Sequence, residues 1–173
     1  SLTFDATSGN QIISARSFGG AVKIENSGAT AGRTVTLGTA ASQTINFQSG
    51  LDITESGSGD AELTGSSNNP AISVTGNLTC SSVGGSNNIT TGAGTWTVSG
   101  NVDLTNCNTV TASAGNTLVM SGSGTLTSNS KTLRNLTLSG TVTLAANTTT
   151  TVAGNFSMAG GTVTATNTTL AMS

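Results

Sequence analysis

The chain of 173 residues is poor in most of the residue types on which catalysis, metal binding and nucleic-acid recognition depend. Histidine and tyrosine are absent, and charged residues make up only 7% of the chain. The lack of histidine excludes the commonest general base and the usual Ser-His and Cys-His nucleophile pairs. Five scattered Lys and Arg form no basic cluster that could bind phosphates, so we expect no nucleic-acid partner. No apolar run approaches the ~20 residues that a membrane helix needs, so we expect no membrane span.

Helix-forming residues are equally scarce, whereas small polar residues dominate. Thr and Ser number 34 and 24, and there are 23 Gly and 17 Asn. Threonine is β-branched and suits a pleated surface, and no stretch has the apolar period of a helix. Disordered chains are usually charged or rich in proline, but this chain has one proline, Pro70. The composition predicts one all-β domain over residues 1–173.

A short phrase repeats along the chain: an alternating strand, then Ser-Gly, Thr-Gly or Ala-Gly, usually followed by Asn. Copies end at Gly76, Gly100, Gly122, Gly140 and Gly154, so the interval between copies shortens along the chain. Repetition of a strand and a turn is typical of stacked architectures, in which each unit buries its apolar face against its neighbours. Intervals of roughly 20 residues suit a coil of two or three short strands.

Most apolar residues from Trp96 to Met158 have even residue numbers. Because side chains alternate between the two faces of a strand, each strand there has one apolar face. The scarcity of aromatic residues is consistent with a narrow interior. In addition, Asn77, Asn101 and Asn155 are placed so that their side chains could stack as a ladder. We therefore predict a parallel β-solenoid, with an antiparallel β-sandwich or jelly roll as the alternative, because parity does not separate the two. The expected strands cover residues 2–5, 21–25, 34–38, 43–47, 51–54, 71–75, 77–80, 95–99, 101–105, 109–113, 117–121, 125–128, 132–138, 141–145, 149–153, 155–159, 162–166 and 168–172.

Two longer stretches carry a family resemblance. Residues 94–102 (GTWTVSGNV) and 133–144 (LRNLTLSGTVTL), with residues 1–13 and 42–47 in the same style, resemble the strand repeats of large secreted bacterial surface proteins. These are adhesins of the filamentous-haemagglutinin type and autotransporter passengers. The resemblance implies a right-handed parallel β-helix with no catalytic motif. It also implies an extracellular or cell-surface location and a role as a structural or adhesive fibre.

The two cysteines, Cys80 and Cys107, follow similar phrases, Leu-Thr and Leu-Thr-Asn. Equivalent positions on adjacent coils of a solenoid lie about 4.8 Å apart, within reach of a disulfide. Both a disulfide and two buried thiols fit this pattern. Two cysteines are too few for a metal site, and we expect no metal and no cofactor.

The only acidic cluster lies between residues 51 and 62 and contains Asp52, Glu55, Asp60 and Glu62. Asp52 and Glu62 could meet on adjacent coils, as a polysaccharide-cleaving pair of acids requires. The same four side chains could bind calcium, but they lack the spacing of the known calcium loops. A solvated acidic loop is the simpler interpretation, and we expect the protein not to be an enzyme.

Two surface features remain open at this stage. Six Asn-x-Ser/Thr sequons are candidates for N-glycosylation, namely Asn77, Asn88, Asn135, Asn147, Asn155 and Asn167. Thr-rich segments at 141–143, 149–151 and 164–166 could form a face that binds ice or glycans, although uneven intervals disfavour a regular array.

Both ends of the chain have the pattern of a strand rather than of a helical cap. We expect the chain to be part of a longer solenoid, or to stack end to end with identical subunits, through Leu2 and Phe4 at one end and Leu170 and Met172 at the other. The sequence thus predicts a non-enzymatic extracellular protein that forms a surface fibre, filament or adhesin stalk.

Overall fold

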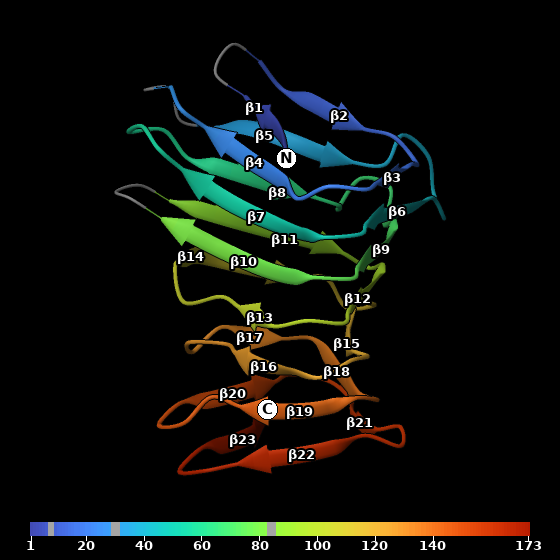
Figure 1. Cartoon of the computed structure of the whole chain (residues 1–173), viewed down its shortest axis with the longest axis vertical. Helices are drawn as coiled ribbons and strands as arrows, with labels where there is room; N and C mark the ends of the chain where they lie inside the picture. Colours follow the sequence, from blue (N-terminus) through green and yellow to red (C-terminus); the bar gives the residue numbers. More distant parts are fainter. Residues whose placement is uncertain (7–8, 29–31, 83–85) are drawn as a thin grey trace.

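A computed structural model of the chain describes residues 1–6, 9–28, 32–82 and 86–173. The described residues form 23 strands with turns between them and contain no helix. Parallel strands stack into a β-solenoid of about seven turns, with the two ends of the stack at opposite ends of the long axis (Figure 1). This confirms the predicted parallel solenoid, and the antiparallel sandwich is wrong.

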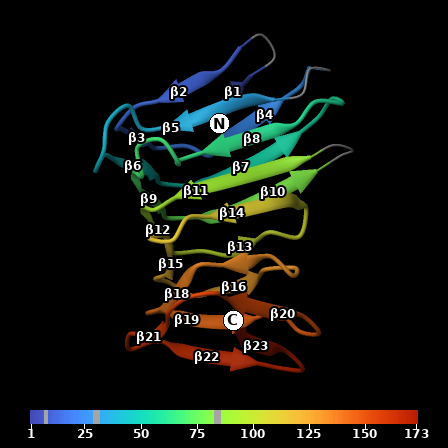
Figure 2. The ribbon, with the colours of Figure 1, turned by 180° about the vertical axis from the view of Figure 1, so that it is seen from behind.

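Each coil passes through three flanks, and equivalent strands of successive coils pair to form sheets. Sheet 1 faces the viewer in Figure 1, and sheet 2 faces the viewer in Figure 2. Sheet 1 contains β1 (Leu2–Asp5), β4 (Val22–Asn26), β7 (Gly50–Glu55), β10 (Asn77–Ser82), β13 (Val102–Asp103), β16 (Gly124–Thr127), β19 (Thr141–Leu144) and β22 (Thr162–Ala165). Sheet 2 contains β2 (Gln11–Ile13), β5 (Arg33–Leu37), β8 (Ala61–Thr64), β11 (Asn87–Gly92) and β14 (Cys107–Ala112). Sheet 3 contains β3 (Ser17–Phe18), β6 (Thr44–Phe47), β9 (Ala71–Val74), β12 (Thr95–Val98), β15 (Thr117–Met120), β18 (Asn135–Leu138) and β21 (Phe156–Met158), and sheet 4 contains β17 (Thr132–Leu133), β20 (Thr149–Val152) and β23 (Thr169–Met172).

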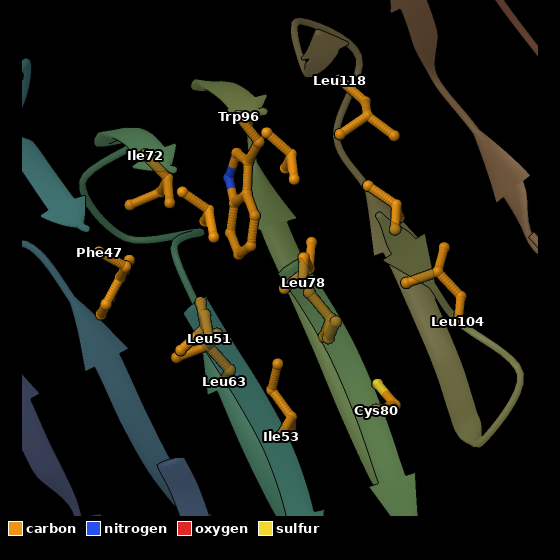
Figure 3. Packing of buried hydrophobic residues seen from close by; sticks show 14 of the residues in the cluster. Phe47, Leu51, Ile53, Leu63, Ile72, Leu78, Cys80, Trp96, Leu104 and Leu118 are labelled. Carbon is orange, nitrogen blue, oxygen red and sulfur yellow. The ribbon is translucent and has the colours of Figure 1, made fainter. Parts of the chain in front are cut away.

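The core is a column of apolar side chains that point inward from all flanks (Figure 3). Along sheet 3, Ile45 pairs with Ile72, Ile72 with Trp96, and Trp96 with Leu118, so each side chain packs on the one in the next coil. Trp96 is 2% exposed and its indole Nε1 donates to the carbonyl of Thr91 at 3.2 Å. Each buried side chain of this size contributes about 1.5–3 kcal/mol, so the stacked core supplies most of the stability.

The coils differ in length, which changes the cross-section along the axis. Along sheet 1, Val22 pairs with Leu51 and Leu126 pairs with Leu144, so a coil near the N-terminal end contains many more residues than one near the other end. The short interval between Gly140 and Gly154 is not a coil length. Gly154 lies at the corner between sheets 4 and 3, whereas the other copies of the phrase lie between sheets 3 and 1.

Asparagine side chains join successive coils at the corners. The Oδ1 atom of Asn77 accepts the backbone N–H of Asn101 at 2.9 Å, and Asn101 in turn accepts that of Thr125 at 2.8 Å. Asn155 belongs to a different ladder from the one predicted, because its N–H donates to Asn135 Oδ1 at 2.8 Å, at another corner. The donors Asn101 and Asn155 lie outside the strands, so these bonds supply partners for N–H groups that strand pairing leaves unpaired.

The second flank is interrupted between the fifth and sixth coils, where sheet 2 ends at β14 and sheet 4 begins at β17. The segment between Asp103 and Thr117 in the fifth coil is almost twice as long as the segment between Thr127 and Asn135 in the sixth. The sixth coil is therefore too short to place a full strand beneath β14. A cavity of about 30 Å³ lies at this break, lined by Val110 and Leu133 and by core residues.

Candidate functional site

The two ends of the solenoid carry the exposed apolar side chains. Among the described residues, the large hydrophobic side chains that are exposed are Leu2, Ile12, Met158 and Met172, at 44%, 63%, 52% and 54%. They lie on β1, β2, β21 and β23, each of which is the terminal strand of its sheet. Leu2, Met158 and Met172 pair with buried residues of the adjacent coil, so they extend the apolar core to the unpaired strand edges. Ile12 pairs with Thr36 and faces outward from sheet 2.

Partly buried apolar side chains lie over the core at both ends. Near the N-terminal end the ring of Phe18 lies edge-on to Phe4 at 5.7 Å and stacks on Phe47 at 5.4 Å, and the Arg16 guanidinium lies over Phe18. At the other end Leu170 is partly buried against the core, beside the exposed Met172. The sequence predicts Leu2, Phe4, Leu170 and Met172 at the ends, but not Ile12 and Met158. The parity of the strand pattern could have indicated Met158.

Threonine side chains form columns on the outer face of sheet 1 in the last three coils. Thr125 pairs with Thr143 and Thr143 with Thr164, while Thr141 pairs with Thr162. Strand spacing places successive hydroxyls of a column about 4.8 Å apart. Uneven coil lengths do not disturb this register, because the extra residues lie in other parts of the coils.

The acidic side chains are not brought together. Asp52 accepts hydrogen bonds from the hydroxyls of Thr79 (2.8 Å) and Ser81 (2.6 Å) on the next coil. Glu62 lies on sheet 2 of the same coil as Asp52, rather than on an adjacent coil as expected, and accepts from Thr34. Glu55 is buried inside the solenoid instead of lying in a solvated loop. The described residues contain no group of three or more His, Cys, Asp or Glu that could hold a metal ion.

Cys80 and Cys107 form a disulfide with a Cα–Cα distance of 5.2 Å. The two residues are not at equivalent positions of one sheet, as the expected geometry supposed. Cys80 lies on β10 of sheet 1, whereas Cys107 begins β14 of sheet 2, because Thr105 and Asn106 form a turn before it. The disulfide therefore crosses a corner and ties the fourth coil to the fifth.

The six sequons differ in accessibility. Asn77, Asn147, Asn155 and Asn167 are exposed or nearly so, whereas Asn88 and Asn135 are half-buried on strands that pair on both sides. The Asn135 amide is also engaged between coils, because its Nδ2 donates to the carbonyl of Asn116 at 2.6 Å. N-glycosylation stays a prediction, and the asparagines at the turns are its better candidates.

The part of the chain that the structure describes includes no helix of the length and apolarity needed to cross a membrane. Comparisons of the chain with family models, curated proteins and solved structures find no match. The fold and the surfaces described above are therefore the basis for the functional argument.

Proposed function

We propose that the protein is a non-enzymatic structural element of an extracellular fibre, surface layer or adhesin stalk. In this proposal it grows by end-to-end β stacking with identical subunits or adjoining repeats. The observation that carries it is the position of the exposed apolar side chains Leu2, Met158 and Met172 on the inward side of terminal strands. Unpaired strand edges accept further strands, and heterologous contacts between opposite ends produce open filaments.

The acidic side chains support a structural rather than a catalytic role. Asp5 accepts from Ser27 Oγ at 2.6 Å, and Asp52 accepts from Thr79 and Ser81, so these carboxylates join neighbouring coils. Glu25 likewise accepts from Ser56 and forms an ion pair with Lys23 at 3.0 Å. A carboxylate held in this way contributes to coil stacking.

Lysine substitutions at one end test the assembly. We expect the wild-type chain to form concentration-dependent filaments, and Met158→Lys and Met172→Lys to raise the concentration needed for assembly at least about tenfold, since burial of an unpaired lysine is costly. Sedimentation velocity and electron microscopy measure the effect. Thr143→Lys, on the exposed outer face of β19, is the matched control and should assemble normally. Wild-type chain that stays monomeric at high concentration would refute the proposal.

A second candidate function is binding of ice or glycans by the threonine columns of sheet 1. The registered column Thr125, Thr143 and Thr164 favours it, because regularly spaced hydroxyls and methyl groups can match an ordered ligand surface. For this function we expect thermal hysteresis, or a signal on a glycan array, that Thr143→Lys reduces at least about tenfold. Thr97→Lys, on the outer face of sheet 3, serves as the control. Activity that is absent in the wild type, or equal in both variants, argues against this function.

A further inference from the structure

The corner between sheets 1 and 2 contains unpaired polar atoms inside the solenoid. Among the described residues, the buried side-chain atoms without a hydrogen-bond partner are Gln11 Oε1, Arg33 Nε, both carboxylate oxygens of Glu55, and Asn87 Oδ1. Gln11, Arg33 and Asn87 begin strands of sheet 2, and Glu55 ends a strand of sheet 1. All of these atoms therefore belong to one corner, in the first four coils.

Among these residues, Glu55 carries the largest free-energy cost of burial. Its exposure is 0%, and neither of its oxygens accepts a hydrogen bond. The ion pair in the described chain joins Lys23 to Glu25. Arg33, whose buried Nε belongs to the same corner, forms no ion pair with Glu55. An isolated carboxylate in an apolar interior is strongly unfavourable unless it is paired, protonated or bound to a metal.

Asn87 adds a third unpaired oxygen to the same region. Its side chain is also fully buried, and its Nδ2 donates to the carbonyls of Ser81 (3.2 Å) and Asn106 (3.3 Å), so its Oδ1 is left without a partner. Ser81 adjoins Ser82, the residue that pairs with Glu55. The Asn87 amide thus reaches the end of β10, which lies directly against the end of β7 that carries Glu55.

Three buried oxygen acceptors without a donor suit a hard cation better than a polar solute. Calcium binds carboxylate, amide and carbonyl oxygens in flexible geometries, whereas magnesium requires a near-ideal octahedron and retains its waters. We propose that Glu55 and Asn87 bind a Ca²⁺ ion at this corner, between the third and fourth coils. One carboxylate supplies little charge, so the affinity belongs to the weak class of extracellular modules, with Kd on the order of 10⁻⁴–10⁻³ M.

This site differs from the group of four acidic residues that the sequence offered for calcium binding. Asp52 and Glu62 accept hydrogen bonds from threonine hydroxyls on other coils, and only Glu55 belongs to both sites. It also does not depend on end-to-end assembly. The cation would replace the missing partner of a buried charge and would lock two coils together.

Thermal unfolding of the whole chain in EDTA and in CaCl₂ tests the site. At calcium about 100-fold above Kd, we expect the wild-type Tm to rise by roughly 5–10 °C, and Glu55→Gln to show no rise. In EDTA the Glu55→Gln variant should melt above the wild type, because it lacks the buried charge. Glu62→Gln, a half-buried carboxylate on the neighbouring strand β8, is the matched control and should respond like the wild type.

Calorimetric titration of the wild type with calcium gives a second measurement that does not rely on a variant. One binding site, with MgCl₂ producing at most a small response, supports the proposal. Absence of binding to the wild type, or an equal Tm rise in Glu55→Gln, would overturn it. A wild-type Tm that is the same in CaCl₂ and in EDTA would also overturn it.

Discussion

Gly76→Ala is expected to destabilise the protein by about 3 kcal/mol or more, or to prevent it from folding. A Cβ at Gly76 would lie 1.6 Å from the carbonyl oxygen of Ser49, which belongs to the backbone of the preceding coil. Because backbone cannot swing away as a flexible side chain does, the two coils would have to separate at this corner. Net stabilities of about 5–15 kcal/mol leave little reserve for such a loss.

Urea unfolding followed by circular dichroism measures this effect. Gly9→Ala is the matched control, because a Cβ there meets no atom within 4 Å. Its stability should lie within about 0.5 kcal/mol of the wild type. A Gly76→Ala variant of wild-type stability would mean that the coils are less closely stacked than described.

Loss of the disulfide is the second large expected effect. The Cys80→Ala/Cys107→Ala double variant should lose about 3.5 kcal/mol, the chain-entropy value for a loop with a sequence separation of 27. The cost arises mainly in the unfolded chain, which becomes less restricted. Urea unfolding of the variant and of the wild type, each with and without a reducing agent, provides the measurement.

The reducing agent should lower wild-type stability to about that of the double variant and leave the variant unchanged, because the chain has no other cysteine to reduce. A loss below about 1 kcal/mol would contradict the expectation and indicate that the fourth and fifth coils are held together by packing alone.

The sequence predicted the strands best where alternation is strict and charge is absent. Expected strands at 125–128, 141–145 and 162–166 agree closely with β16, β19 and β22. The strand β11, Asn87–Gly92, was missed because it has one large apolar residue, Ile89, among residues that include two Asn and a Gly, which strands usually avoid. It forms because β8 and β14 pair with it on both sides, which is information from outside the segment.

Corners were harder to predict than strands. Residues 132–138 were expected to form one strand, but the chain turns at Arg134 and forms β17 and β18 on different flanks. Leu133 and Leu136 both face the interior although their parity differs, because the chain turns between them. The apolar pattern therefore indicates which side chains face the inside of the solenoid. The boundary between two flanks is marked only by the change from odd to even numbering of the inward residues.

The candidate site, too, could be predicted from the sequence only in part. The apolar ends could be predicted, because Leu2 and Met172 follow the inward parity of their strands. Alternation with Leu51 and Ile53 also indicates an inward side chain at Glu55, but its acidic neighbours led to the interpretation of a solvated loop. The register that pairs Asn26 with Glu55 and Glu55 with Ser82 extends β7 to this residue, so the carboxylate lies within the stack rather than in a loop.

The break in the second flank has a mechanical consequence. Tension along the axis is carried by three rows of hydrogen bonds at each junction among the first five coils and between the sixth and seventh coils. Two rows are present between the fifth and sixth coils and again where β22 and β23 join the seventh coil. The disulfide bridges the fourth and fifth coils and so gives no reinforcement where the rows are fewest. We expect a molecule pulled from both ends to open at these two junctions first, so that the five coils above the lower end of β14 stay together as one unit.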